Sequence, residues 1–297
     1  NSGYFQRVLV TPQTNQKGIE NIPVNILLIP ATNQQYSIGG GYGTDTSIRG
    51  TLGVNIRQVN GYGHKFSSQL QASPYNSSLT LNYQIPKPDP TRNMITLSSG
   101  IGEINEINSV ENHSKVAKVS ATYTTTYDKW IQNTSLIALY EDYELSDMQS
   151  KAELIYPDLE WKYLNSNKDL NPDKGVSLNI NLMGTPRFLA YSSQPNPANF
   201  VQARLDVRFL HTFDLTHTRL LLRASVAKTF ISDISNLPLS LQLFAGGAQS
   251  IRGYSYNSIG ETNLGTDLIV YSSELQQKIF GHWYLGAFYD AGTVADT

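Results

Sequence analysis

Apolar and polar residues alternate along most of this chain with a period of two. In one such stretch, Val201, Ala203 and Leu205 fall on the same face of an extended backbone. Gln202 and Arg204, which lie between them, fall on the opposite face. Such alternation is typical of strands with one apolar and one polar face, whereas helical periodicity is almost absent. The chain is therefore predicted to be all-β.

The alternating segments predict about thirteen antiparallel strands joined as a meander. The strands are roughly 9–14 residues long, which exceeds the usual globular length of about 5–6 and suits a tilted membrane-spanning strand of about 9–11. This length favours a transmembrane barrel over a soluble β-sandwich, which would show the same alternation. The predicted strands are residues 34–44, 47–59, 63–73, 77–85, 93–103, 114–127, 130–144, 150–163, 175–185, 199–213, 217–231, 267–279 and 282–290.

Composition narrows the choice of class and of partners. Charged residues make up 15% of the chain, against roughly 25% in typical soluble domains, and mean hydropathy is −0.30. On composition alone, a Tyr- and Asn-rich soluble sandwich fits as well as a membrane barrel. A net charge of −2 without a basic run argues against nucleic acid as a partner. No apolar stretch has the length of a transmembrane helix.

Motifs of catalysis are missing, so the chain is predicted not to be an enzyme and to need no cofactor. It has no cysteine, and its five histidines lack the spacing of metal ligands, so no metal site is expected. The glycine run at residues 39–43 precedes no helix and cannot be a nucleotide loop. Acidic pairs such as Glu141 and Asp142 are interpreted as strand-end or loop charges.

One stretch, residues 244–260, combines glycines, aromatic residues and an arginine in a way that a plain hairpin tip does not need. It reads FAGGAQSIRGYSYNSIG, and Arg252 stands in its Ile-Arg-Gly-Tyr core. In the two segments that follow, parity places Glu274 and Asp290 on the polar face of adjacent strands. An arginine fork can bridge two such carboxylates by charge-assisted hydrogen bonds.

This stretch closely resembles the inward-folded loop of the BamA/TamA superfamily of outer-membrane assembly barrels, and most of all the TamA branch. In that superfamily the loop arginine enters the lumen and meets acidic residues of the next two strands. These motifs stand here as residues 272–274 (SSE) and 288–292 (FYDAG). The resemblance is strong over residues 238–292 and looser before them. It implies a lumen loop latch with Glu274 and Asp290 as acidic partners, formed by Gly246, Gly247, Ile251, Arg252, Gly253 and Tyr254. The glycines are expected to permit a tight backbone approach to the barrel wall.

The resemblance also implies a domain organisation. Residues 32–297 would be a sixteen-stranded transmembrane up-and-down barrel, of which the C-terminal strands are missing here. Residues 1–31 would be the C-terminal hairpin of the last POTRA domain, a periplasmic module. The first barrel strand is rich in glycine, which weakens strands, so it is a candidate for an opening seam. Its glycines are Gly39, Gly40, Gly41 and Gly43.

The function implied by the resemblance is the insertion of autotransporters and other β-barrel proteins into the outer membrane of a Gram-negative bacterium, without nucleotide hydrolysis. The expected partners are unfolded outer-membrane clients, the lipid bilayer and a TamB-like protein of the inner membrane and periplasm. Three alternatives remain: a two-partner secretion pore, a BamA-type general assembly factor and a passive porin. The number of POTRA domains would separate the first two from the TamA type.

Overall fold

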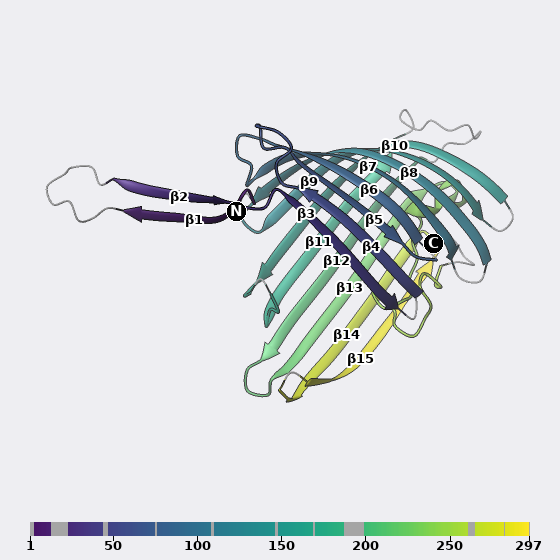
Figure 1. The fold of residues 1–297 in the computed structure, drawn as a ribbon. Helices are drawn as coiled ribbons and strands as arrows, with labels where there is room; N and C mark the ends of the chain where they lie inside the picture. The colour runs from purple at the N-terminus through teal and green to yellow at the C-terminus, as the bar shows by residue number, and fades with distance from the viewer. Residues whose placement is uncertain are drawn as a thin grey trace.

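The computed structural model shows a chain of antiparallel strands that form one large and one small sheet. It describes residues 3–12, 23–43, 47–74, 76–107, 110–145, 148–168, 170–186, 199–260, 265–281 and 283–296. In this part of the chain, every strand of the large sheet pairs with its neighbours in sequence, in the order β15 to β3. The sheet curves into a deep trough (Figure 1). The predicted all-β, up-and-down architecture is therefore confirmed.

The strands of the large sheet follow the predicted segments closely. They are β3 Gln34–Gly43, β4 Ser47–Ile56, β5 Lys65–Ala72, β6 Asn76–Pro86, β7 Asn93–Ile107, β8 Val110–Tyr127, β9 Trp130–Leu145, β10 Met148–Ser166, β11 Lys174–Thr185, β12 Phe200–Phe213, β13 Thr218–Ile231, β14 Asp267–Phe280 and β15 Trp283–Ala295. The largest difference is at β15, predicted to end at residue 290. It continues because Gly292 and Val294 still pair with Val270 and Leu268 of β14.

Strands β7 to β10 are longer than the alternation indicated, and β10 reaches 19 residues. The ends of these strands are polar, so the alternation of apolar and polar residues stops there while the backbone pairing between strands continues. Glu103, for example, still pairs with Lys115 across β7 and β8. Backbone hydrogen bonding, which does not depend on side-chain polarity, therefore sets these strand lengths.

The two faces of the sheet differ as parity predicts. On β14, Ile269, Tyr271 and Leu275 are exposed, whereas Leu268 and Val270 are buried. The outward face thus presents apolar side chains with no protein cover, and the concave face carries polar groups or is covered by the chain itself. Among the residues that the structure describes, no helix combines the length and the apolar character needed to cross a bilayer.

Residues before the large sheet form a separate hairpin. Strand β1, Phe5–Pro12, pairs with β2, Val24–Pro30, and the hairpin projects away from the sheet (Figure 1). At its base, the Tyr4 hydroxyl donates to the carbonyl of Gly63 and Arg57 donates to the carbonyl of Gly3. The hairpin geometry agrees with the sequence pattern, and its assignment to a POTRA domain stays a prediction.

The described residues that connect β13 and β14 pack on the concave side of the sheet and form the core there. We call residues 232–260 together with 265 and 266 the lumen loop. It contains two short 3₁₀ helices, η1 Ile234–Asn236 and η2 Leu239–Leu241. Its apolar residues join three buried clusters, which involve β9, β10, β12, β13, β14 and β15. The loop therefore packs against β9 and β10 at one end and against β14 and β15 at the other.

Candidate functional site

Arg252 in the lumen loop binds two carboxylates from adjacent strands. Its Nε donates to Oδ2 of Asp290 at 2.8 Å, and its Nη2 donates to Oδ1 of the same residue at 2.9 Å. Its Nη1 pairs with Glu274 of β14, and its backbone N–H also donates to Asp290 at 2.9 Å. The two-pronged geometry fixes both the charge and the orientation of the guanidinium group.

The surroundings of Arg252 hold its positive charge in place. The Asp290 side chain is only 2% exposed, whereas that of Arg252 is 21% exposed. Hydrogen bonding to Asp290, supported by Glu274 and opposed by burial, raises the pKa of Arg252 above its usual value. The guanidinium carbon also lies 3.7 Å from the ring centroid of Phe288, a cation–π contact. Arg252 is thus a permanent cation tied to β14 and β15.

The glycines of the latch serve the loop itself. Gly246 has φ +110°, and a Cβ there would lie 2.3 Å from the carbonyl oxygen of Ser255, within the loop. Gly247 and Gly253 also have positive φ, and a Cβ on Gly253 would meet nothing within 4 Å. The expected tight approach of these glycines to the wall is therefore wrong for Gly246 and Gly253. Their backbone shape, which L side chains rarely adopt, is what requires glycine.

The close approach to the wall comes from Ile251 and a glycine of β15. Ile251 is 4% exposed and packs in a cluster that includes Leu268 and Val294. A Cβ on Gly292 would lie 3.0 Å from Cδ1 of Ile251 and 2.5 Å from the carbonyl of Ile269. The missing side chain at Gly292 thus makes room for the loop. Tyr254, in contrast, is 59% exposed.

A second attachment of the lumen loop, which the sequence did not indicate, is formed by Glu141 of β9. Its carboxylate is fully buried and accepts hydrogen bonds from the N–H of Ser240 at 3.1 Å and from the hydroxyl of Ser114 at 2.7 Å. The Ser240 hydroxyl donates to its other oxygen. The interpretation of Glu141 as a strand-end or loop charge is therefore wrong. Its neighbour Asp142 pairs at the surface with Lys151.

Apolar side chains surround this second attachment. Leu237, Leu239, Leu241 and Leu243 are all buried, the first completely. Leu237 and Leu241 pack with residues of β9, β10 and β12. The carbonyl of Leu241 also accepts a hydrogen bond of 2.9 Å from Gln202. The four leucines at alternate positions in the sequence could have indicated that this segment is buried. The segment nevertheless forms 3₁₀ turns instead of a strand.

The glycines of the predicted seam lie on an edge strand. In the part of the chain that the structure describes, β3 pairs with β4 alone, so one of its sides carries no partner strand. Gly40 stands opposite Gly50, and a Cβ on Gly39 would meet the Thr51 hydroxyl at 2.6 Å. The neighbouring strand thus lies close against Gly39, whereas the space beside Gly40 is open. That this edge opens stays a prediction.

Within the residues described, no group of three or more His, Asp or Glu side chains is placed to hold a metal ion. His282 lies outside these residues. The predictions that the protein binds no metal and is not an enzyme remain predictions.

Comparisons with known proteins give the same picture of the fold. Residues 32–297 match the family model described as the Omp85 superfamily domain. BamA from Haemophilus ducreyi lacking POTRA domains 1–3 superposes with a TM-score of 0.81 at 16% identity, over 99% of this chain. CdiB from Escherichia coli gives 0.60 at 14% identity over 96%, and CdiB from Acinetobacter baumannii gives 0.57 at 13% over 97%.

The chain is shorter than each of these solved proteins. It spans 64% of the BamA chain and 56% and 55% of the two CdiB chains. At these identities the likeness establishes the barrel fold. It does not distinguish an assembly factor from a secretion transporter.

Proposed function

The chain belongs to the Omp85 superfamily, and on that premise we propose that it is an outer-membrane assembly factor of the TamA type. In this role it assists the insertion of autotransporters and other β-barrel proteins into the outer membrane of a Gram-negative bacterium, without nucleotide hydrolysis. The uncovered apolar face of the sheet meets the lipid, and the polar face lines the lumen.

The observation that carries the proposal is the latch between Arg252 and its two acidic partners. A passive pore has no need for a lumen loop whose arginine is held by Asp290 and Glu274 together. The Ile-Arg-Gly-Tyr core and the two acidic motifs occur in the order and spacing that the BamA/TamA superfamily shows, and the wording of residues 244–260 resembles the TamA branch most. As positioning groups, they would hold the barrel in the conformation that receives a client.

The glycine-rich edge supplies the mechanism of insertion. Strand β3 offers backbone N–H and C=O groups on its free side, and an unfolded client strand can add there by β-augmentation. Unpaired backbone groups in lipid each cost several kcal/mol, so a client strand that pairs with the edge is strongly stabilised. The free energy of strand pairing then drives insertion, in place of the free energy of nucleotide hydrolysis.

The partners follow from the same proposal. The hairpin β1–β2 is the end of the last POTRA domain, on the periplasmic side, and would lead to a TamB-like partner. Counting the POTRA domains of the full-length protein separates the related types, because the TamA type carries three, the BamA type usually five and the two-partner type two.

The test is client insertion into proteoliposomes. Full-length protein is reconstituted, an unfolded autotransporter barrel is added, and its protection from protease is followed over time. We expect protection to appear faster than in empty liposomes. Equal rates in both, together with passage of a soluble client or plain ion conductance, would replace the assembly role by a secretion pore or a porin.

A matched control uses an arginine far from the latch. Arg92→Gln removes one guanidinium group at the turn between β6 and β7, where it pairs with Asp89 at the surface. This variant is expected to insert clients at the unaltered rate. It shows that any defect of a latch variant does not come from the loss of one positive charge in itself.

A further inference from the structure

A pair of arginines lies beside the latch, on the polar face of β12 and β13. Arg208 and Arg223 occupy directly opposite positions in the register of the two strands. The same register row continues to Ser272 on β14 and then to Asp290 on β15. Like charges placed opposite each other on one face of a sheet destabilise the pair. A group that compensates this repulsion would therefore stabilise the sheet.

The nearest carboxylate on the β12 side is already engaged. Asp206 binds the guanidinium fork of Arg204, with distances of 2.9 Å to Oδ2 and 3.1 Å to Oδ1. Its Oδ1 also accepts the hydroxyl of Ser225. Arg208 interacts with Asp206 only electrostatically, without a hydrogen bond. It forms no hydrogen bond or ion pair with any residue that the structure describes.

The carboxylates of β14 and β15 are engaged as well, because Glu274 and Asp290 hold Arg252 and act on Arg223 only through their charge. Arg223 instead donates from Nη2 to the neutral hydroxyl of Ser272, at 3.1 Å. The same hydroxyl oxygen accepts Nη2 of Arg252, also at 3.1 Å. Two guanidinium groups thus meet on one uncharged acceptor. The row from β12 to β15 has more positive than negative charge at its centre.

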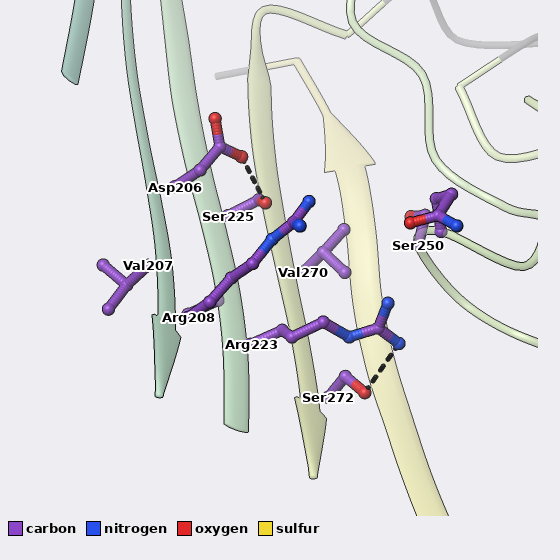
Figure 2. A pocket seen from close by; sticks show the side chains of 10 residues that line it. Asp206, Val207, Arg208, Arg223, Ser225, Ser250, Val270 and Ser272 are labelled. Carbon is purple, nitrogen blue, oxygen red and sulfur yellow. Dashed lines mark hydrogen bonds between the residues drawn. The ribbon is translucent and has the colours of Figure 1, made fainter. Parts of the chain in front are cut away.

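A small cavity lies where these arginines meet the lumen loop. Its volume is about 30 Å³, and its lining includes Arg208, Arg223, Ser250 and Ser272, together with Asp206, which Arg204 and Ser225 already engage. Figure 2 shows both guanidinium groups extending from their strands on the side of the sheet where the loop carries Ser250. A space of this size holds one or two water-sized groups. The oxygen atoms of a small oxyanion can enter it while the remainder faces the lumen.

We propose that Arg208 and Arg223 form a binding site for a phosphate-class oxyanion beneath the lumen loop. Guanidinium forks bind such oxyanions through paired, charge-assisted hydrogen bonds. The hydroxyl of Ser250 is a further donor from the loop side. The bound anion removes the repulsion between the two strands and links the Arg252 end of the loop to β12 and β13, in addition to its attachment to β14 and β15. This site is independent of the proposed insertion of clients.

The experiment is a calorimetric titration of full-length protein in a non-ionic detergent, at constant ionic strength. One arm uses inorganic phosphate, and a second uses dihexanoyl phosphatidic acid, whose headgroup carries the same chemistry on a lipid. We expect saturable binding of phosphate at one site. Markedly tighter binding of the lipid would identify a headgroup as the source of the anion, and equal or weaker binding would identify the free ion.

Variants assign the binding to this cavity. Arg208→Gln and Arg223→Gln are each expected to weaken phosphate binding at least tenfold, and Arg92→Gln is expected to leave it unaltered. Arg208→Lys keeps the charge but loses the fork, so it should bind about three- to tenfold more weakly. If Arg208→Gln does not fold, as judged by its β-sheet circular dichroism, Arg208→Lys decides. No saturable binding by the wild type, or unaltered affinity in the folded Arg208 variants, overturns the proposal.

Discussion

The two attachments of the lumen loop hold it by different physical means. At the Arg252 end, charged groups that keep some contact with the lumen form a salt-bridge network with β14 and β15. At the Glu141 end, leucines bury the loop against β9, β10 and β12, and a single enclosed carboxylate fixes the backbone at Ser240. The first attachment requires a defined orientation of the charged groups and depends on their charges. The second rests mainly on the burial of apolar side chains, which does not require a particular orientation of the contacting groups.

This difference indicates a division of labour within one loop. An ion pair can exchange one partner for another without a change of packing, whereas a buried cluster opens only when its apolar surface meets water. The Arg252 end is therefore the one that a change of barrel state can release, and the Glu141 end keeps the loop in the lumen. The following predictions test the division by disturbing each end separately.

The largest effect is expected from Arg252→Ala. The substitution removes the hydrogen-bonded cation of Asp290 and Glu274, at a cost of about 4 kcal/mol for a largely buried network. Amide hydrogen exchange should rise at least a hundredfold in residues 246–254 and remain slow in residues 237–243. The rate of client insertion should decrease in the same variant. Full insertion activity by a well-folded variant would show that the latch is not needed.

A smaller effect, confined to the other end, is expected from Leu237→Ala. Leu237 is completely buried, and truncating such a leucine costs about 3 kcal/mol because a cavity is left. Exchange should now rise in residues 237–243 while residues 246–254 stay protected. If both segments lose protection together, the loop is one cooperative unit and the division into two ends is wrong.

Glu141→Gln should act at the same end with less force. The amide keeps the shape of the carboxylate, but one of its two oxygens becomes an NH₂ group that cannot accept hydrogen bonds from Ser240 or Ser114. The expected loss is about 2 kcal/mol, since hydrogen bonds to charged acceptors are worth about 1.5–3 kcal/mol. Hydrogen exchange at the Ser240 amide measures it. Gln276→Ala, a polar change in β14, serves as the comparison and should leave that amide unaffected.

The smallest effect is expected from salt. Raising ionic strength from about 0.1 to 1 M shortens the Debye length from about 10 to 3 Å. This should weaken the Arg252 end by about 0.5 kcal/mol and roughly double exchange in residues 246–254. The apolar end should not weaken. A loss of protection at residues 237–243 in high salt would contradict its apolar character.

Much of this fold could be predicted because the chain repeats one simple pattern. Alternation with a period of two fixes which residues of a strand face the lumen, and the meander leaves little freedom in strand order. The same parity places Glu274 and Asp290 on one face of adjacent strands. The pairing of Arg252 with both carboxylates therefore follows from local pattern and a known loop motif.

The attachment at Glu141 could not be predicted in this way. Glu141 and Ser240 are 99 positions apart, and their contact depends on how far the loop reaches across the curved sheet. Parity alone places Glu141 on the inner face but does not reveal what covers it. The arginine pair on β12 and β13 could not be predicted either. Its formation depends on the exact register of the two strands, and a one-residue change would separate Arg208 from Arg223.

The lumen loop also bears on the curvature of the sheet. Its two attachments, at β9 and β15, are six strand spacings apart, or about 29 Å along the sheet at about 4.8 Å per spacing. The loop joins them across the concave side with only the residues between Ser240 and Arg252. It therefore acts as a chord across an arc whose length the strand spacing fixes, so the length of the loop sets the curvature of this part of the wall. Releasing the chord at Arg252 would let the wall flatten and widen, and a change of that kind reaches the far edge of the sheet without any local contact there.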